Sequence, residues 1–360
     1  MRKRVAVVGA TGIAGQQFVL ALAQHPWFEI VRLAASERSA GKTYRAALRD
    51  PGTGARRWWC PEEPPVHLLD LPVENADGLE LDGVDLVFSA IESDAARELE
   101  GRYARSTPVL SAASAFRYDE DVPILVPGVN PEHAALIDHQ RRARGWRGFV
   151  APLPNCTTMG LAMTLRPLQE RFGVQRVVMT SLQGISGAGR SPGVIALDIA
   201  DNVIPFIPGE EEKVARETGK ILGRLDGARG VVPATFPVSA TCTRVAVSEG
   251  HTEAVAVSLG AAATPADVAG AFGDFGRDLA RLALPSAPRR LITVHDDPFR
   301  PQPRIDRDAD GGMTTSVGRI RADAALAHGV KYVLVSHNTK MGAASGAVLT
   351  AECLARAGYL

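Results

Sequence analysis

The feature that most constrains the fold is the start of the chain, where "RVAVVGATGIAGQQF" runs from Arg4 to Phe18. Residues 5–8 are apolar at every position, which is typical of a strand covered on both faces of a sheet. Gly9, Gly12 and Gly15 follow, and helical spacing begins after them. A helix that starts after such a loop can hold the pyrophosphate of a dinucleotide. Because the spacing is G-x-x-G-x-x-G rather than G-x-G-x-x-G, the prediction rests on the position of the loop, and a purely structural turn stays open.

Later stretches extend this pattern over about the first 150 residues. "FEIVRLAAS", "VDLVFSAI" and "TPVLSAAS" read as apolar strands that alternate with helical segments. They predict an α/β chain whose N-terminal domain, residues 1–150, is a Rossmann-type doubly wound parallel sheet. A length of 360 residues suits two domains.

The second domain is expected over residues 151–337. Its strand-like stretches show the two-residue alternation of a mixed or largely antiparallel sheet: "QRVVMTSLQGIS", "FPVSATCTRVAVS", "TEAVAVSLG" and "LITVHDD". Helices are expected after Cys156 and near residues 210–223. The last segment, residues 338–360, ends in a helix that we expect to return to the first domain.

The end of the second predicted strand indicates which dinucleotide is bound. "AASERSAGK" places Ser36, Arg38 and Ser39 beside the expected ribose. Glu37 could bind the 2′-hydroxyl of NAD, but an arginine flanked by two hydroxyls is better suited to a 2′-phosphate. The sequence therefore favours NADP(H), with Gly9, Thr11, Gly12 and Ile13 at the pyrophosphate.

Charge and cysteine content exclude several classes of function. Forty basic and forty acidic residues cancel, and no basic stripe favours nucleic acid or a membrane surface. No run approaches the roughly 20 apolar residues that span a bilayer. The four cysteines are scattered, without zinc-ligand spacing, so we expect no metal. A reducing cytoplasm is the expected location.

A candidate nucleophile lies in "LPNCTTMGLAM". Pro154 and Asn155 interrupt the chain, and Cys156 begins a helix-periodic run. A helix N-terminus favours negative charge, so we expect a lowered thiol pKa and a reactive thiolate. A buried, inert cysteine is the alternative. In "TRVAVSEGHTEAVAV", Arg244 and His251 lie on either side of a glycine turn, where the histidine could serve as an acid or base.

Taken together, these motifs resemble the aspartate-β-semialdehyde dehydrogenase family, in its archaeal and fungal branch. The resemblance covers essentially the whole chain and is carried by the following stretches in order: "GATGIAGQQF", "LAASERSAGK", "LVPGVNPEH", "LPNCTTMGLA", "QGISGAGRSPGV", "IPGEEEKVARETGKILG", "RVAVSEGHTEAV", "SVGRIR" and "SHNTKMGAASGAVLTAE". The resemblance implies a second domain of α+β type, catalytic and dimerising, like that of glyceraldehyde-3-phosphate dehydrogenase.

The resemblance also implies an activity and a set of site residues. The family reduces β-aspartyl phosphate with NADPH to aspartate semialdehyde, through a cysteine thioester, in the biosynthesis of lysine, threonine and methionine. The implied catalytic residues are Cys156, His251, Gln183 and Asn155. Those implied to bind the substrate are Arg117, Glu210, Lys213 and Arg244, although Glu211 or Glu212 could replace Glu210. Ser89, Gly187 and Asn338 are implied as further cofactor contacts.

Small molecules are thus the expected partners, together with other copies of the chain in a homodimer or homotetramer. The nearest alternative activity is that of a malonyl-CoA reductase or another acyl reductase, which needs no site for an α-amino group. A non-catalytic NADP-binding homologue is the alternative outside enzymes. A cysteine–histidine hydrolase would have no use for the dinucleotide loop.

Overall fold

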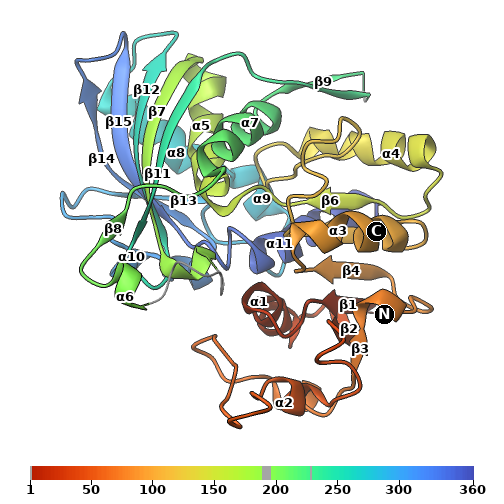
Figure 1. Cartoon of the computed structure of the whole chain (residues 1–360). Helices are drawn as coiled ribbons and strands as arrows, with labels where there is room; N and C mark the ends of the chain where they lie inside the picture. Colours follow the sequence, from red (N-terminus) through yellow and green to blue (C-terminus); the bar gives the residue numbers. More distant parts are fainter. Residues whose placement is uncertain (1, 189–195, 228) are drawn as a thin grey trace.

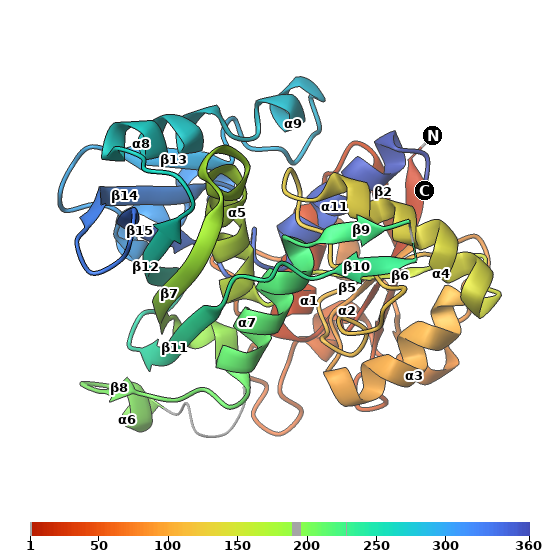
Figure 2. The same ribbon diagram turned by 90° about the horizontal axis from the view of Figure 1, so that it is seen from above.

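The computed structural model describes residues 2–188, 196–227 and 229–360. Positions 189–194 of the "QGISGAGRSPGV" motif therefore lie outside the described residues. Two sheets organise the described chain, one of six strands and one of seven, with a two-stranded ribbon beside them. Figures 1 and 2 show the seven-stranded sheet on one side of the molecule and the six-stranded sheet on the other, with helices α5 and α7 between them.

The first sheet is wholly parallel and has the strand order β3-β2-β1-β4-β5-β6. Its strands are β1 (Lys3–Val8), β2 (Phe28–Ala35), β3 (Val73–Asn75), β4 (Leu86–Ser89), β5 (Val109–Ser111) and β6 (Val150–Pro152). This is the Rossmann order, so the predicted fold class is confirmed. The strand order reverses between β1 and β4, which is where such sheets bind ligands at the carboxyl ends of their strands.

Helices cover both faces of the first sheet. They are α1 (Ile13–Leu22), α2 (Tyr44–Ala47), α3 (Ser93–Ala104), α4 (Leu136–Arg144) and α11 (Ala344–Arg356). Val5 and Val7 of β1 join the cluster that contains α1 and α11, whereas Ala6 and Val8 join the cluster that contains α3. Successive side chains of a strand point to opposite faces, and this explains the unbroken apolar run at the start of the chain.

The second sheet is mixed, as predicted, and has the order β13-β14-β15-β12-β7-β11-β8. Its strands are β7 (Val174–Gln183), β8 (Val203–Ile204), β11 (Val238–Val245), β12 (His251–Leu259), β13 (Ile292–His295), β14 (Thr315–Asp323) and β15 (Gly329–Ser336). Two neighbouring pairs, β7 with β11 and β13 with β14, are parallel, and the others are antiparallel. Strands β14 and β8 were not predicted from the sequence, and neither was the ribbon of β9 (Arg224–Asp226) and β10 (Gly230–Val232).

One face of this second sheet is packed by helices. α5 (Cys156–Phe172), α7 (Glu210–Ile221) and α8 (Pro265–Asp274) contact its strands. The opposite face of the central strand β7 exposes Val178 and Leu182, at 42% and 38% of their surface. The shorter helices lie in the connections: α6 (Ala196–Ile199), α9 (Arg277–Arg281) and α10 (Pro303–Asp306), with 3₁₀ turns at Val66–Leu68, Ala76–Gly78, Pro131–Ala135, Ile185–Ala188 and Ala309–Gly312.

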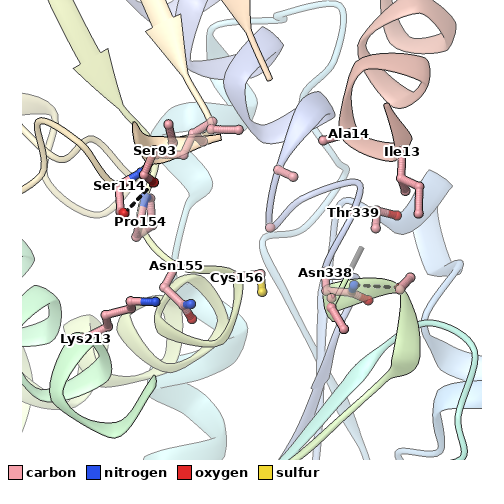
Figure 3. A pocket seen from close by; sticks show the side chains of 18 of the residues that line it. Ile13, Ala14, Ser93, Ser114, Pro154, Asn155, Cys156, Lys213, Asn338 and Thr339 are labelled. Carbon is pink, nitrogen blue, oxygen red and sulfur yellow. Dashed lines mark hydrogen bonds between the residues drawn. The ribbon is translucent and has the colours of Figure 1, made fainter. Parts of the chain in front are cut away.

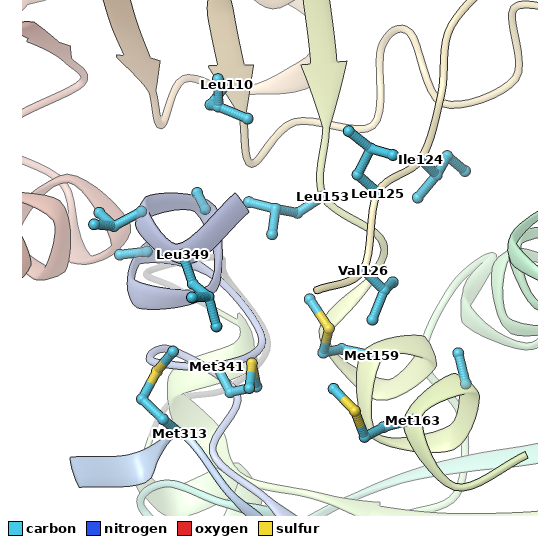
Figure 4. Close-up of a cluster of buried hydrophobic side chains, with 14 of the residues drawn as sticks. Leu110, Ile124, Leu125, Val126, Leu153, Met159, Met163, Met313, Met341 and Leu349 are labelled. Carbon is cyan, nitrogen blue, oxygen red and sulfur yellow. The ribbon is translucent and has the colours of Figure 1, made fainter. Parts of the chain in front are cut away.

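A shared apolar core joins the two halves. One apolar cluster contains residues from both halves: Leu110 of β5, Met159 of α5 and Leu349 of α11, together with Leu153 and Met341 in loops (Figure 4). Helix α11 packs against α1 and β5, and strand β6 carries the first sheet on to Pro152, just past the expected division. The division into residues 1–150 with the C-terminal segment, and 151–337, stays a prediction.

Candidate active site

Strand register brings three polar residues together at one end of the neighbouring strands β12, β7 and β11. Gln183 ends β7, and Arg244 lies directly opposite it on the parallel neighbour β11. His251 begins β12, the antiparallel neighbour on the other side, where Thr252 lies opposite Leu182. Helix α5 packs against β7 and β12, and Cys156 is its first residue. The pairing of β7 with both strands brings together residues that lie far apart in sequence.

Cys156 and His251 form a contact pair. The sulfur lies 3.2 Å from His251 Nε2, and the backbone N–H of Gly184 donates to Nδ1 at 3.1 Å. Since Nδ1 accepts a hydrogen bond, the proton of the neutral ring resides on Nε2 and faces the sulfur. Burial, aided by Arg244, lowers the pKa of His251 to about 3. The histidine is therefore neutral at physiological pH and is a proton donor toward the sulfur.

The predicted direction of the cysteine pKa is wrong. Burial, followed by the charge of Glu210, raises the pKa of the Cys156 thiol to about 12, although Arg244 and Arg117 act in the opposite direction. The helix N-terminus is a local effect, whereas the burial comes from the surrounding protein. Cys156 keeps partial exposure to the cavity described below. In this form of the enzyme the sulfur is a thiol.

Glu210 is the member of the acidic run that enters the site. Its Oε1 accepts hydrogen bonds from Asn155 Nδ2 at 2.9 Å and from Gln183 Nε2 at 3.1 Å. Glu211 instead accepts from the backbone N–H of Cys242, and Glu212 is exposed. The question that the sequence left open is thus answered by geometry.

Asn155 has two functions in the structure. Its Oδ1 accepts from the N–H groups of Thr157 and Thr158, at 2.9 and 3.4 Å, which caps helix α5. One of its amide hydrogens is used by Glu210. A side-chain amide carries two hydrogens, so the second could donate to a reacting oxygen, in line with the catalytic role that the resemblance implied.

Arg117 and Lys213 bring positive charge to the same cavity. Arg117 is buried and its Nη1 donates to Glu217 Oε1 at 3.0 Å. Glu217 was not predicted from the sequence; it is fully buried and lies seven residues after Glu210 on α7. A spacing of seven places two helical residues on one face, and this was the available signal.

Arg244 and His251 lie beneath Gly187. Neither is among the residues that line the cavity, but Gly187 is. A Cβ atom on Gly187 would be 2.9 Å from Arg244 Nη1 and 3.1 Å from His251 Cε1. Arg244 Nη1 donates to the carbonyl of Gly184 at 2.8 Å. The structure therefore holds both side chains directly behind a glycine that no larger residue can replace without displacement.

Cys156 lies within a cavity of about 740 Å³ that runs between the two sheets. Figure 3 shows it between Asn155 and Lys213 on one side and Asn338 and Thr339 on the other. Asn338 is buried there, with its Oδ1 accepting from Gly250 N–H and its Nδ2 donating to Ser186 Oγ, both at 2.8 Å. Its amide joins two site loops, and whether it contacts a cofactor stays a prediction.

The glycine loop fits a dinucleotide. Gly9 has φ +81°, and a Cβ atom there would be 2.4 Å from the carbonyl oxygen of Ala90, so only glycine allows this approach to the end of β4. No side chain caps α1, whose first residues Ile13 and Ala14 line both the Cys156 cavity and a second cavity of about 530 Å³. Uncapped N–H groups at a helix start are suited to phosphate.

The second cavity contains most of the residues predicted to bind the cofactor. It is lined by Thr11, Gly12, Ile13, Ser36, Arg38 and Ser39, among others. Ser89 is different: it is fully buried, its hydroxyl donates to Glu100 Oε1 at 2.7 Å, and it lines neither cavity. Ser89 is the last residue of β4, and a contact between Ser89 and the cofactor stays a prediction.

Among the residues that the structure describes, no cluster of three or more His, Cys, Asp or Glu side chains could hold a metal ion, and no helix is long and apolar enough to cross a membrane. The fold and the site define a class of protein: a dinucleotide-binding enzyme in which a cysteine and a histidine are in contact beside a cavity between two sheets.

Comparison with known proteins gives the family. The description "Semialdehyde dehydrogenase, NAD binding domain" matches residues 4–137, and "Semialdehyde dehydrogenase, dimerisation domain" matches residues 165–341. Together with the relatives below, these matches show that the chain belongs to the aspartate-semialdehyde dehydrogenase family, as the motifs indicated.

Archaeal and fungal relatives are similar over nearly their full length. The aspartate-semialdehyde dehydrogenase of Methanothermobacter thermautotrophicus is 46% identical, covering 97% of this chain and 98% of the relative. That of Saccharomyces cerevisiae is 41% identical over 98% of each. Among solved structures, aspartate semialdehyde dehydrogenase with NADP from Candida albicans superposes with a TM-score of 0.89 at 38% identity, covering 100% of both chains. Aspartate semialdehyde dehydrogenase II complexed with ASA from Vibrio cholerae has a TM-score of 0.76 at 27% identity, covering 99% of each.

Proposed function

We propose that this protein catalyses the NADPH-dependent reductive dephosphorylation of β-aspartyl phosphate to aspartate semialdehyde, a step in the biosynthesis of lysine, threonine and methionine. The observation that carries the proposal is the contact of Cys156 Sγ with His251 Nε2 at 3.2 Å. Cys156 lines the first cavity, which shares Ile13 and Ala14 with the second cavity, where most of the predicted cofactor residues lie. The family supports the substrate, and the C. albicans relative was solved with NADP.

The charges around the cavity match such a substrate. β-Aspartyl phosphate carries an ammonium, a carboxylate and a phosphate, with a net negative charge. Arg117 and Lys213 supply positive charge for the phosphate, and Arg244 does so for the carboxylate past Gly187. Glu210, held by Asn155 and Gln183, faces the ammonium. A malonyl-CoA substrate carries no ammonium to pair with this carboxylate.

The residues then divide the chemistry between them. The sulfur of Cys156 attacks the acyl carbon, and a thioester forms as the bond to phosphate breaks. The thiol proton leaves with the phosphate. Bound NADPH supplies hydride. His251 donates an Nε2 hydrogen bond to the oxyanion of the hemithioacetal. As this oxygen re-forms the C=O bond of the aldehyde, the C–S bond breaks, and the Cys156 sulfur leaves as a thiolate that regains a proton from solvent. The free N–H of Asn155 stabilises the negative oxygen, and Gln183 fixes Glu210.

The open face of the second sheet is the proposed contact between two copies of the chain. The match to a dimerisation domain covers residues 165–341, which include this sheet. Val178 and Leu182 expose apolar surface at its centre. We infer a homodimer, or a homotetramer of such dimers. The four cysteines are free, and a nucleophilic thiol is best preserved in a reducing cytoplasm.

The function is tested by following NADPH absorbance with purified protein, NADP, aspartate semialdehyde and phosphate. We expect NADP reduction that stops when phosphate is omitted, because the thioester then has no acceptor. Cys156→Ala should abolish turnover and leave NADPH binding intact, whereas Cys353→Ala on α11 should change neither. A wild-type protein that binds NADPH but remains inactive here, and active with malonyl-CoA, would contradict the proposed substrate.

A further inference from the structure

Glu217 contacts two separate parts of the site with its two oxygens. Oε1 accepts from Arg117 Nη1 at 3.0 Å and from the Tyr118 hydroxyl at 3.3 Å. Oε2 accepts from the backbone N–H of Asn155 at 2.6 Å, immediately before Cys156. Glu217 has no exposed surface and does not line the cavity. It therefore connects the loop after β5 to the start of α5 without access to a substrate.

Arg117 is oriented by these contacts, which use two of the five N–H donors of its guanidinium. Nη1 is used by Glu217, and Nη2 donates to the carbonyl of Ala112 at 3.0 Å. Nε is buried and has no hydrogen-bond partner among the described residues, although Arg117 lines the cavity. Each η nitrogen carries two hydrogens, and the contacts with Glu217 and Ala112 use one on each, so Arg117 keeps donors for an anion in the cavity that it lines.

Helix α7 also fixes the backbone that carries Arg117. Lys220 Nζ donates to the carbonyls of Arg117 and Asp119, at 2.9 and 2.7 Å. On the same helix, Glu210 and Lys213 line the cavity. Spacings of three, four and seven residues place all four α7 side chains on one helical face. One rigid element thus sets the distance between the anion-binding side of the cavity and the nucleophile.

We propose that Glu217 is a positioning residue that aligns Arg117 with the backbone of the nucleophile loop, so that a phosphate on Arg117 places its acyl carbon at Cys156. The proposal rests on the proposed function, in which Arg117 binds phosphate. Glu217 acts through these two partners and touches neither substrate nor cofactor. Its removal should consequently weaken the use of phosphate more than the use of NADP.

The test compares Glu217→Gln with Glu212→Gln in the phosphate-dependent reduction of NADP. An amide presents hydrogens where the carboxylate accepted them, so it cannot accept from both Arg117 and Asn155. We expect Glu217→Gln to raise KM for phosphate tenfold or more and to lower kcat, with KM for NADP unchanged. Glu212, on the same helix but exposed, should behave as wild type after the same substitution.

A double-variant cycle separates the two partners. In an Arg117→Ala background, Glu217→Gln should raise KM for phosphate no further, because its effect on phosphate passes through that arginine. If Glu217→Gln leaves KM for phosphate unchanged while Arg117→Ala raises it, the proposal for Glu217 is overturned. If Arg117→Ala itself leaves that KM unchanged, the phosphate assignment of Arg117 fails first, and a wild-type enzyme without phosphate-dependent activity refutes the proposed function.

As a control for protein stability, the melting temperature of every variant is recorded. Should Glu217→Gln not fold, Glu217→Asp provides the same comparison, since it keeps the charge but is too short to reach both partners. A rise in KM for phosphate with a melting temperature near that of wild type supports positioning. Loss of stability with an unchanged KM shows a merely structural carboxylate and overturns the proposal.

Discussion

At the scale of single residues, the charge beside the nucleophile explains its resting state. The carboxylate of Glu210 adds to burial in raising the thiol pKa of Cys156, and Arg117 and Arg244 oppose it. A substrate ammonium that pairs with Glu210 would cancel the unfavourable charge. Reactivity of the sulfur is therefore expected to depend on a filled cavity.

The pH dependence of cysteine alkylation tests this resting state. Because the pKa of the Cys156 thiol is raised to about 12, the thiolate fraction of the free enzyme rises about tenfold per pH unit throughout the neutral range. We expect the rate of iodoacetamide labelling at Cys156, read by peptide mass spectrometry, to increase steadily from pH 7 to pH 10. Cys353, whose pKa is also raised to about 12, is the reference. A plateau below pH 9 would show a thiolate already formed.

At the scale of elements, the short turn Ile185–Ala188 completes the site. The N–H groups of Ile185 and Ser186 donate to the carbonyls of Val247 and Ser248, at 2.7 and 3.0 Å. These bonds join the end of β7 to the loop that precedes β12. The turn lies against the two side chains that the strand register brought together, and Gly187 is its closest point.

Substitution of Gly187 should damage catalysis more than folding. A Cβ atom in Gly187→Ala would meet Arg244 and His251 at 2.9 and 3.1 Å, which forces one of them to shift. We expect kcat/KM to fall tenfold or more with NADPH binding retained. The control is Gly270→Ala, within helix α8, where nothing lies within 4 Å of the added atom; it should stabilise the protein by about 0.5–1 kcal/mol. A fully active Gly187→Ala enzyme would show that Gly187 does not lie against Arg244 and His251 during turnover.

At the scale of the whole molecule, the two sheets differ in how they are covered. The first is enclosed by helices on both faces, whereas among the described residues the longer helices that contact the second sheet, α5, α7 and α8, all lie on one side of it (Figure 1). An antiparallel or mixed sheet can leave one face to solvent, but that face is then usually polar. Here it exposes Val178 and Leu182 near its centre, which favours a protein partner.

Oligomeric state should respond to a charge on this open face. Val178→Glu places a carboxylate on β7, in the middle of the proposed contact. Dimerisation would remove this charge from water without giving it a partner, which is unfavourable. We expect light scattering to give the mass of one chain for this variant and at least twice that mass for the wild type. Val66→Glu, at a first-domain position that is 76% exposed, should leave the mass unchanged. An unaltered mass for Val178→Glu would place the contact elsewhere.

Much of the architecture could be predicted because it is local in the chain. The strands β1, β2, β4 and β5 have apolar runs bounded by turns, and α5 begins directly after Pro154 and Asn155. The strand β14 was missed although its "SVGRIR" motif was noticed, since its bulged pairing with β15 weakens the alternation. Very short strands such as β8 have too few residues to show a period.

The sequence by itself determined the parallel α/β character of the first 150 residues, the dinucleotide loop and, through its motifs, the family. Only the tertiary structure decided which carboxylate enters the site, which acceptor Ser89 donates to, and whether the Cys156 thiol is ionised. His251 lies 95 residues from Cys156, and Glu217 lies 100 residues from Arg117. Burial and hydrogen bonding depend on such distant partners, whereas a pattern of residues reports only the preferences of neighbours along the chain.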